Sequence, residues 1–278
     1  MGKTILSQLL RILLICALLL VGGYFFFVQT RIGQSIDNAA YFGHDAVHRA
    51  VLAWDGKILS TVTPHTLIVA AIVVIVLSIL RRRISTGVLL VAAMAVAVEG
   101  AELLKRYLPR EQLVDPAGPV PPYFRTDTYP SGHTTFGTSI ALALLLVLPA
   151  AWRPWFAVVA AGGSAAYAVG VLFAGWHRPS DSIGGILWAA LCMGSAAAVI
   201  LWIRKSRAVP RSPHPAAKAL PFTVGTAALL AVLWSASLSG GRFPDADAPF
   251  FIASALIVGT AFAVGGSFGW LLGGADEL

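Results

Sequence analysis

The sequence has few charged residues for its length. Of its 278 residues, 12% are Asp, Glu, Lys or Arg, whereas 57% are hydrophobic. An ordinary soluble domain carries roughly twice this share of charged residues, so the composition excludes that class. The apolar residues fall in long blocks of about membrane-spanning length, which predicts an integral membrane protein.

Cysteine is also scarce. The two cysteines, Cys16 and Cys192, both lie inside hydrophobic blocks, which excludes a disulfide framework and a cysteine-based metal site. The first block, residues 5–28, has few flanking positive charges and no small-residue cleavage site after it. It is therefore interpreted as a retained helix and not as a signal peptide.

Acidic residues are fewer than basic ones, 13 against 20, which gives a net charge of +7. Such a charge can indicate a nucleic-acid partner, but most of these cations stand in short loops beside hydrophobic blocks, where they set membrane topology. We therefore expect a membrane environment and no nucleic-acid partner.

The hydrophobic blocks predict an all-α membrane bundle of about eight spanning helices, because backbone polar groups cannot stay unpaired in lipid. The predicted spans are residues 5–28, 65–80, 86–104, 134–150, 154–174, 182–203, 219–239 and 249–272. We expect a six-helix core over 1–203, a basic, proline-rich linker over 204–218, and a C-terminal helix pair over 219–278.

The positions of the cations predict the orientation in the membrane. Residues 81–83, Arg153 and the loop 204–218 all fall on one side if the spans alternate, and the positive-inside rule makes that side cytoplasmic. Both termini are then cytoplasmic. The loops 29–64, 105–133 and 175–181, which hold the chemically interesting motifs, converge on the extracytoplasmic face of the cell membrane.

The stretch 33–54 is interpreted as an amphipathic helix on that outer surface. Its candidate lipid-facing residues are Ile36, Tyr41, Val47, Val51 and Trp54. The same stretch holds His44 and His48 at the i, i+4 spacing of a metal pair, but no third ligand of evident position follows, and an interfacial helix explains the pair more simply.

The motif Trp176-His177-Arg178-Pro179-Ser180-Asp181 places a histidine four residues before a carboxylate. In a helical turn this spacing brings His177 and Asp181 to one face. A carboxylate that holds one imidazole nitrogen leaves the other free to attack. Alternatively, Asp181 caps the following helix, and the two interpretations are compatible.

A second histidine motif, Tyr129-Pro130-Ser131-Gly132-His133, stands at the start of the predicted span 134–150. Backbone N–H groups at a helix N-terminus bind anions, and Gly132 permits a close approach. Ser131 adds a hydroxyl donor, and His133 can protonate a leaving oxygen. The alternative is a helix cap with an interfacial histidine.

Lys105 and Arg110 lie where the third predicted span leaves the membrane. Phosphoryl transfer depends mainly on positioning and charge stabilisation, which fixed cations provide. Glu102 can form an ion pair with Lys105 or Arg106 and thereby orient that cation. The alternative is that these are snorkelling side chains at a helix end.

Together these motifs resemble the type 2 phosphatidic acid phosphatase family, whose fold is shared with vanadium haloperoxidases. Residues 130–133 match its Pro-Ser-Gly-His motif in full, and His177 with Asp181 match the His-x3-Asp half of another. The block Gly-Trp-His-Arg-Pro-Ser-Asp also looks like actinobacterial members. The resemblance covers about residues 65–203. It implies these roles: His177 as nucleophile, Asp181 as its partner, His133 as acid and then base, and Ser131, Gly132 and Lys105 as phosphate ligands.

The chain departs from the family pattern at two places. Where the third motif has Ser-Arg, this chain has Gly170-Val171, so one phosphate-binding arginine is missing. In the first motif, the position at which the family has an arginine is occupied by Gln112. Arg178, Arg106 or Arg125 can supply the lost charge, and Arg178 is the best placed of them because it adjoins the predicted nucleophile.

The prediction is a membrane phosphatase that acts without a metal or other cofactor on a lipid or polyprenyl (di)phosphate. Arg110 and Arg178 join Lys105, Ser131 and Gly132 as predicted phosphate ligands. Two alternatives remain: a phosphotransferase that uses the same site, and a degenerate protein that only binds phosphorylated lipid. The sequence identifies no protein partner.

Overall fold

The computed structural model describes residues 4–46, 55–114, 128–206, 222–227, 248–276 and 278. All regular elements within these ranges are helical, which confirms the predicted all-α class. The named elements are α1 (Ile5–Gly23), η1 (Tyr24–Val28), α2 (Arg31–Phe42), η2 (Gly43–Ala46), α4 (Pro64–Leu80), α5 (Ile84–Tyr107), α6 (Gly132–Val147), η3 (Ala150–Trp152), α7 (Arg153–Phe173), α8 (Pro179–Ile203) and α10 (Ala248–Leu272).

Five helical segments in the described part of the chain are long and apolar enough to cross a membrane. They are Ile5–Val28, Ile84–Tyr107, Ala150–Phe173, Pro179–Ile203 and Ala248–Leu272. The helices α4 and α6 are apolar but shorter, and only residues 222–227 of the predicted span 219–239 are described. The protein is therefore a membrane-embedded helical protein with five candidate spans among the described residues, and the predicted count of eight is not confirmed.

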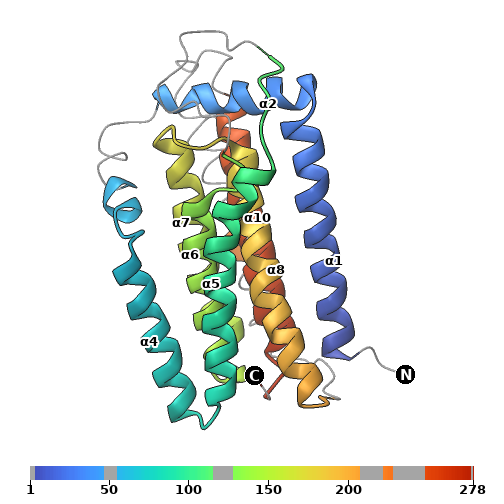
Figure 1. The fold of residues 1–278 in the computed structure, drawn as a ribbon, viewed down its shortest axis with the longest axis vertical. Helices are drawn as coiled ribbons and strands as arrows, with labels where there is room; N and C mark the ends of the chain where they lie inside the picture. Colours follow the sequence, from blue (N-terminus) through green and yellow to red (C-terminus); the bar gives the residue numbers. More distant parts are fainter. Residues whose placement is uncertain (1–3, 47–54, 115–127, 207–221, 228–247, 277) are drawn as a thin grey trace.

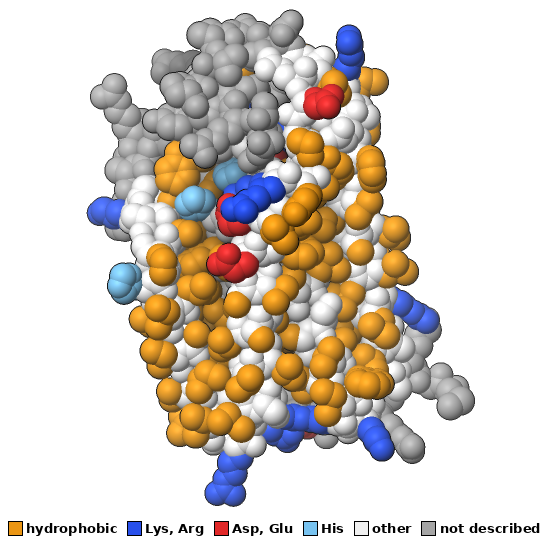
Figure 2. Space-filling model, viewed as in Figure 1, with side chains coloured by type: hydrophobic (Ala, Val, Ile, Leu, Met, Phe, Trp, Pro, Cys, Tyr) orange, Lys and Arg blue, Asp and Glu red, His pale blue; other side chains and the backbone are white. Residues whose placement is uncertain are grey.

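The long helices form an upright bundle, and α2 lies across one end of it (Figure 1). Both marked chain ends lie at the opposite end of the bundle. The sides of the bundle carry many exposed apolar side chains, among them Leu14, Leu18, Ile72 and Val96. Figure 2 shows this largely hydrophobic surface on one face, with a group of titratable side chains near the α2 end. Such a surface suits contact with lipid tails.

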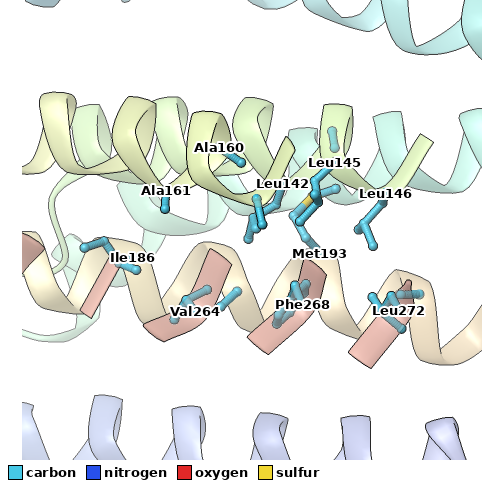
Figure 3. Close-up of a cluster of buried hydrophobic side chains, with 14 of the residues drawn as sticks. Leu142, Leu145, Leu146, Ala160, Ala161, Ile186, Met193, Val264, Phe268 and Leu272 are labelled. Carbon is cyan, nitrogen blue, oxygen red and sulfur yellow. The ribbon is translucent and has the colours of Figure 1, made fainter. Parts of the chain in front are cut away.

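The core lies where α6, α7, α8 and α10 meet. Figure 3 shows Leu145 and Met193 in one cluster with Phe268 and Leu272 of α10, and all four are buried. The helix α10 approaches α7 through small residues. A Cβ atom built on Gly269 would lie only 2.5 Å from Cβ of Ala157. Small residues at such crossings let helix backbones pack closely.

Arg153 is buried at the start of α7, although the sequence places it among the topology-setting loop cations. Its Nη1 donates hydrogen bonds to the carbonyls of Leu272 and Ala275, both at 2.7 Å. The cation thereby satisfies carbonyl groups at the C-terminal end of α10, where a positive charge also complements the helix dipole.

One expectation about α2 is wrong. Tyr41, predicted to face lipid, is 2% exposed, and its hydroxyl donates a 2.6 Å hydrogen bond to the carbonyl of Gly175. Ile36 is 50% exposed, as expected. Val47, Val51 and Trp54 lie outside the described residues. The tyrosine turns inward because its hydroxyl finds a partner there, which an aliphatic side chain cannot do.

Candidate active site

Asp181 stands in the first turn of α8, where it both caps the helix and approaches a histidine. Its Oδ2 accepts a 3.0 Å hydrogen bond from the backbone N–H of Arg178. The same oxygen lies 3.5 Å from Nδ1 of His177, at the outer limit of hydrogen-bond distance. Asp181 therefore caps α8, and its carboxylate lies beside His177, whose Nδ1 makes no hydrogen bond within the described residues. This arrangement leaves Nε2 of His177 as the nitrogen turned away from the carboxylate.

A glycine turn before α8 fixes the backbone of His177. Gly175 has a φ of +64° and follows the end of α7, a conformation that glycine adopts without strain. The N–H groups of Trp176 and His177 donate to the carbonyl of Val171, at 2.9 and 3.1 Å. The N–H of Gly175 also donates to the carbonyl of Leu172 at 3.0 Å. This bond and the bond from Trp176 form a Schellman motif, which ends α7 and directs the chain into the site.

The N-termini of α6 and α8 are joined at Ser131. Its Oγ accepts a 3.3 Å hydrogen bond from the N–H of Thr134, which makes it the cap of α6. Its own backbone N–H donates to the carbonyl of Asp181 at 2.9 Å. The positive ends of two helix dipoles therefore meet at this point, which is a suitable place for an anion.

The two histidines lie close together at this junction. The ring centroids of His133 and His177 are 6.5 Å apart, with the ring planes inclined by 58°. Trp176 packs edge-on against His133, at a centroid distance of 5.2 Å. His177 is buried and His133 is partly exposed. One phosphate group placed between the two rings can contact both.

Lys105 reaches the same junction from the last turn of α5. Its Nζ forms a 2.7 Å ion pair with Oε1 of Glu102, one of the two pairings that the sequence left open. A Cβ atom on Gly132 would lie 2.4 Å from that Oε1 and 3.1 Å from Nζ. The lysine and its carboxylate therefore lie directly against the start of α6, and the glycine provides the space.

Arg110 is more deeply buried than its predicted place at a helix end suggests: it is 3% exposed. Its Nη2 donates to Oδ2 of Asp37 at 2.9 Å, to Oγ of Ser180 at 2.9 Å, and to Oδ1 of Asp181 at 3.3 Å. Its Nε and Nη1 have no hydrogen-bond partner among the described residues. The guanidinium thus joins α2, α8 and the segment after α5.

Arg178, which directly follows His177 in the chain, is also buried. Its Nε donates to Oδ1 of Asn38 at 2.9 Å, and its Cζ lies 5.9 Å from the ring centroid of Tyr41. Val171, at the position of the missing family arginine, is fully buried. The arginines in the described part of the site are therefore Arg110 and Arg178, while Arg106 is exposed and Arg125 lies outside the described residues.

The pKa values of the two buried arginines shift in opposite directions. Burial by itself lowers the pKa of Arg110, but the carboxylates of Asp181 and Asp37 raise it above its ordinary value. Burial, followed by the charge of Arg110, lowers the pKa of Arg178. Since a guanidinium keeps its proton in proteins, both remain cations near neutral pH.

The contribution of α2 to the site is not among the predictions made from the sequence motifs. Gln34, Asp37, Asn38 and Tyr41 are buried on one side of α2, and three of them contact Arg110 or Arg178. Their spacing of i, i+3, i+4 and i+7 is the signal that could have identified them, because it places four hydrogen-bonding side chains on one helix face.

His44 lies beside the site and not at an evident metal centre. Its Nδ1 is 2.7 Å from the carbonyl of Tyr41, and a Cβ atom on Gly175 would lie 2.6 Å from its Nε2. His48, the other half of the predicted pair, lies outside the described residues. In the ranges that the structure describes, no group of three or more His, Cys, Asp or Glu side chains could hold a metal ion.

The fold and this site define a membrane-embedded helical protein with a histidine, carboxylate and arginine cluster at one end. Residues 88–208 match the family model of the PAP2 superfamily. The match supports the assignment to a type 2 phosphatidic acid phosphatase-like family that the motifs predicted, and members of the superfamily are generally phosphatases. No curated protein and no solved structure matched the chain.

Proposed function

We propose that the protein is a membrane phosphatase that removes a terminal phosphate from a lipid or polyprenyl (di)phosphate through a phosphohistidine intermediate. The observation that carries this proposal is the meeting of His177, Asp181 and His133 at two helix N-termini, beside three cations. Phosphoryl transfer needs a positioned nucleophile, an acid and fixed positive charge around the phosphate oxygens.

In the first step, Nε2 of His177 attacks phosphorus and the bond from phosphorus to the leaving oxygen breaks. His133 donates a proton to that oxygen. In the second step, water attacks the phosphohistidine, His133 takes up a proton from the water, and the nitrogen–phosphorus bond breaks to release inorganic phosphate. Asp181 holds Nδ1 of His177 throughout and stabilises the positive charge that develops on the ring.

The predicted phosphate ligands are Lys105, Arg110, Arg178 and the start of α6 at Ser131 and Gly132. The Nε and Nη1 donors of Arg110 have no acceptor within the described ranges. Arg178 adjoins His177 in the chain. Together the two arginines offer the charge that Val171 does not supply, because a guanidinium binds two phosphate oxygens at once.

An apolar cavity of about 430 Å³ supports a lipid substrate. It lies between α1, α5 and α8, and its lining includes Leu20, Leu104, Trp188 and Tyr129. Tyr129 directly precedes Pro130 and Ser131 of the site. A hydrocarbon chain in this cavity would bring an attached phosphate to the membrane end where the two histidines lie, because apolar chains partition into such clefts.

The proposal is tested by phosphate release from the purified, detergent-solubilised protein with a chelator present. The panel consists of lipid and polyprenyl mono- and diphosphates. We expect release by the wild-type protein, and a loss of at least about three orders of magnitude in His177→Ala. His65→Ala is the matched control, because His65 is exposed at the start of α4, and it is expected to keep wild-type activity.

Rapid quenching with a phosphorus-labelled substrate should trap an acid-labile, base-stable protein phosphate in the wild type only. Labelling without phosphate release, followed by transfer to an added alcohol, would identify a phosphotransferase instead. Substrate binding with neither labelling nor release would contradict the enzymatic proposal and identify a lipid-binding relative.

A further inference from the structure

The inward face of α2 is a continuous set of contacts to the candidate site. Gln34 donates to the carbonyl of Glu111 at 2.6 Å and accepts from the N–H of Leu113 at 3.0 Å. Asp37 and Asn38 contact one arginine each. This helix therefore holds the segment that carries Arg110 as well as the guanidinium itself. The outward residues Ile32 and Ile36 are exposed, so the polar face of the helix is the buried one.

Asp37 is the most constrained member of this face. Its Oδ1 accepts from the N–H of Ser180 at 3.0 Å, and its Oδ2 accepts from Oγ of Ser180 at 2.6 Å and from Nη2 of Arg110 at 2.9 Å. Burial raises the pKa of Asp37 above its ordinary value; Arg110 and the donors of Ser180 oppose this rise, and the neighbouring Asp181 adds to it. Because three donors converge on its two oxygens, we assign the ionised form to Asp37.

Arg110 is thereby shared between two carboxylates. Its Nη2 lies 2.9 Å from Asp37 and 3.3 Å from Asp181. Two carboxylates and one guanidinium carry one net negative charge. Without Asp37, Arg110 would pair with Asp181 alone, and that pair would have a net charge of zero. Arg178, in contrast, contacts the neutral amide of Asn38 and the ring of Tyr41, whereas Arg110 receives the hydrogen-bonded carboxylate of Asp37.

From this geometry we propose that Asp37 is a positioning residue for phosphoryl transfer, acting through Arg110. By sharing Arg110, it leaves the negative charge of Asp181 available to His177, whose ring becomes positive as it attacks phosphorus. Asp37 also fixes the position of Nη2 of Arg110, so that the N–H groups at Nε and Nη1 of the same guanidinium keep a constant direction. The proposal rests on the proposed function, because it assigns Asp37 a part in the same reaction. A residue that acts at this step changes kcat more than KM.

The test compares Asp37→Asn with the wild type in the same detergent. Asparagine keeps the shape and one of the two oxygens that accept from Ser180, but it removes the charge. We expect kcat to fall by roughly 10- to 100-fold, with KM changed by less than about threefold. The kcat of Asp37→Glu, which keeps the charge, should lie between those of the wild type and Asp37→Asn. Ser35→Ala, on the exposed side of α2, is the matched control and should retain wild-type kcat.

A double-mutant cycle separates a positioning role from a merely structural one. In an Arg110→Gln background, Asp37→Asn should lower kcat by less than about twofold, because its effect passes through Arg110. An effect of full size in that background would overturn the proposal, and so would an unchanged kcat in Asp37→Asn alone. Thermal unfolding of each variant shows whether a loss of kcat merely reflects loss of the fold.

Binding of orthovanadate provides a readout that does not need turnover, because five-coordinate vanadate imitates the transferring phosphoryl group. We expect binding that depends on His177 and weakens about tenfold or more in Asp37→Asn. Wild-type protein with neither turnover nor such binding would overturn the proposed function and this inference together. Normal behaviour of the wild type with an unaffected Asp37→Asn variant would overturn the inference alone.

Discussion

At the residue scale, Gly132 has the least free space around it in the candidate phosphate site. A Cβ atom there would lie 2.4 Å from Oε1 of Glu102 and 3.1 Å from Nζ of Lys105. We expect Gly132→Ala to push this ion pair away from the start of α6. Because a displacement of about 1 Å at a catalytic site can cost on the order of 100-fold, kcat/KM should fall by up to that factor.

The matched control for this prediction is Gly162→Ala in α7. A Cβ atom on Gly162 meets nothing within 4 Å, and alanine favours a helix by roughly 1 kcal/mol over glycine. Phosphate release by this variant should match the wild type, with equal or slightly higher thermal stability. Equal activity in both alanine variants would show that the space at Gly132 is not needed.

The sequence revealed those parts of the site that lie close together along the chain. His177 and Asp181 are one helical turn apart, and residues 131–133 are contiguous, so each group could be found as a motif. The contacts of Asp37 could not be found in this way, because Arg110 is 73 residues away and Ser180 is 143 residues away. Motif spacing says nothing about pairs that only the folded bundle brings together.

At the element scale, the packing of α10 on α7 depends on small residues. A Cβ atom on Gly269 would lie 2.5 Å from Cβ of Ala157 and 2.9 Å from the backbone oxygen of Arg153. Neither neighbour can move without shifting a helix. We expect Gly269→Ala to destabilise the protein by about 1–3 kcal/mol, the usual cost of overpacking, measured as a lower unfolding temperature in detergent.

Gly259→Ala, also in α10, is the control for the prediction about the packing of α10 on α7. A Cβ atom on Gly259 meets nothing within 4 Å, so the unfolding temperature should stay the same or rise slightly. If both alanine variants unfold at the wild-type temperature, the close approach of α10 and α7 does not contribute measurably to stability.

The helices themselves were predictable because long apolar blocks have no other stable form in lipid. The predicted segments 65–80 and 182–203 differ from α4 and α8 by only a few residues at their ends. The placement of α2 was not predictable from hydrophobicity alone. Its inward side chains are polar, and it is their hydrogen bonds to Arg110, Arg178 and Gly175 that hold it across the bundle.

At the scale of the whole molecule, the candidate site lies at the α2 end of the bundle, and both chain ends lie at the other (Figure 1). The proposed orientation makes the site extracytoplasmic and both termini cytoplasmic. In a background without Cys16 and Cys192, we expect Tyr107→Cys to react with a membrane-impermeant maleimide in intact cells. Tyr107 is 74% exposed at the site end of α5.

Arg82→Cys, in the exposed turn after α4, is the opposite probe. It should react with the same maleimide only after the membrane is permeabilised, because the positive-inside rule places that turn in the cytoplasm. The reverse pattern of labelling would place the candidate site in the cytoplasm, and its substrate in the inner leaflet.

The contacts between α2 and the buried arginines also limit how this chain can be divided. The segment that matches the PAP2 superfamily begins at residue 88, whereas Asp37 and Asn38 come from well before it. A protein trimmed to that segment would bury Arg110 beside Asp181 only and would take Asn38 away from Arg178. Breaking a buried ion pair costs about 3–5 kcal/mol. A fragment that keeps these contacts must therefore include α2 as well as the matched segment, and chimeras with proteins of the PAP2 superfamily should exchange the two together.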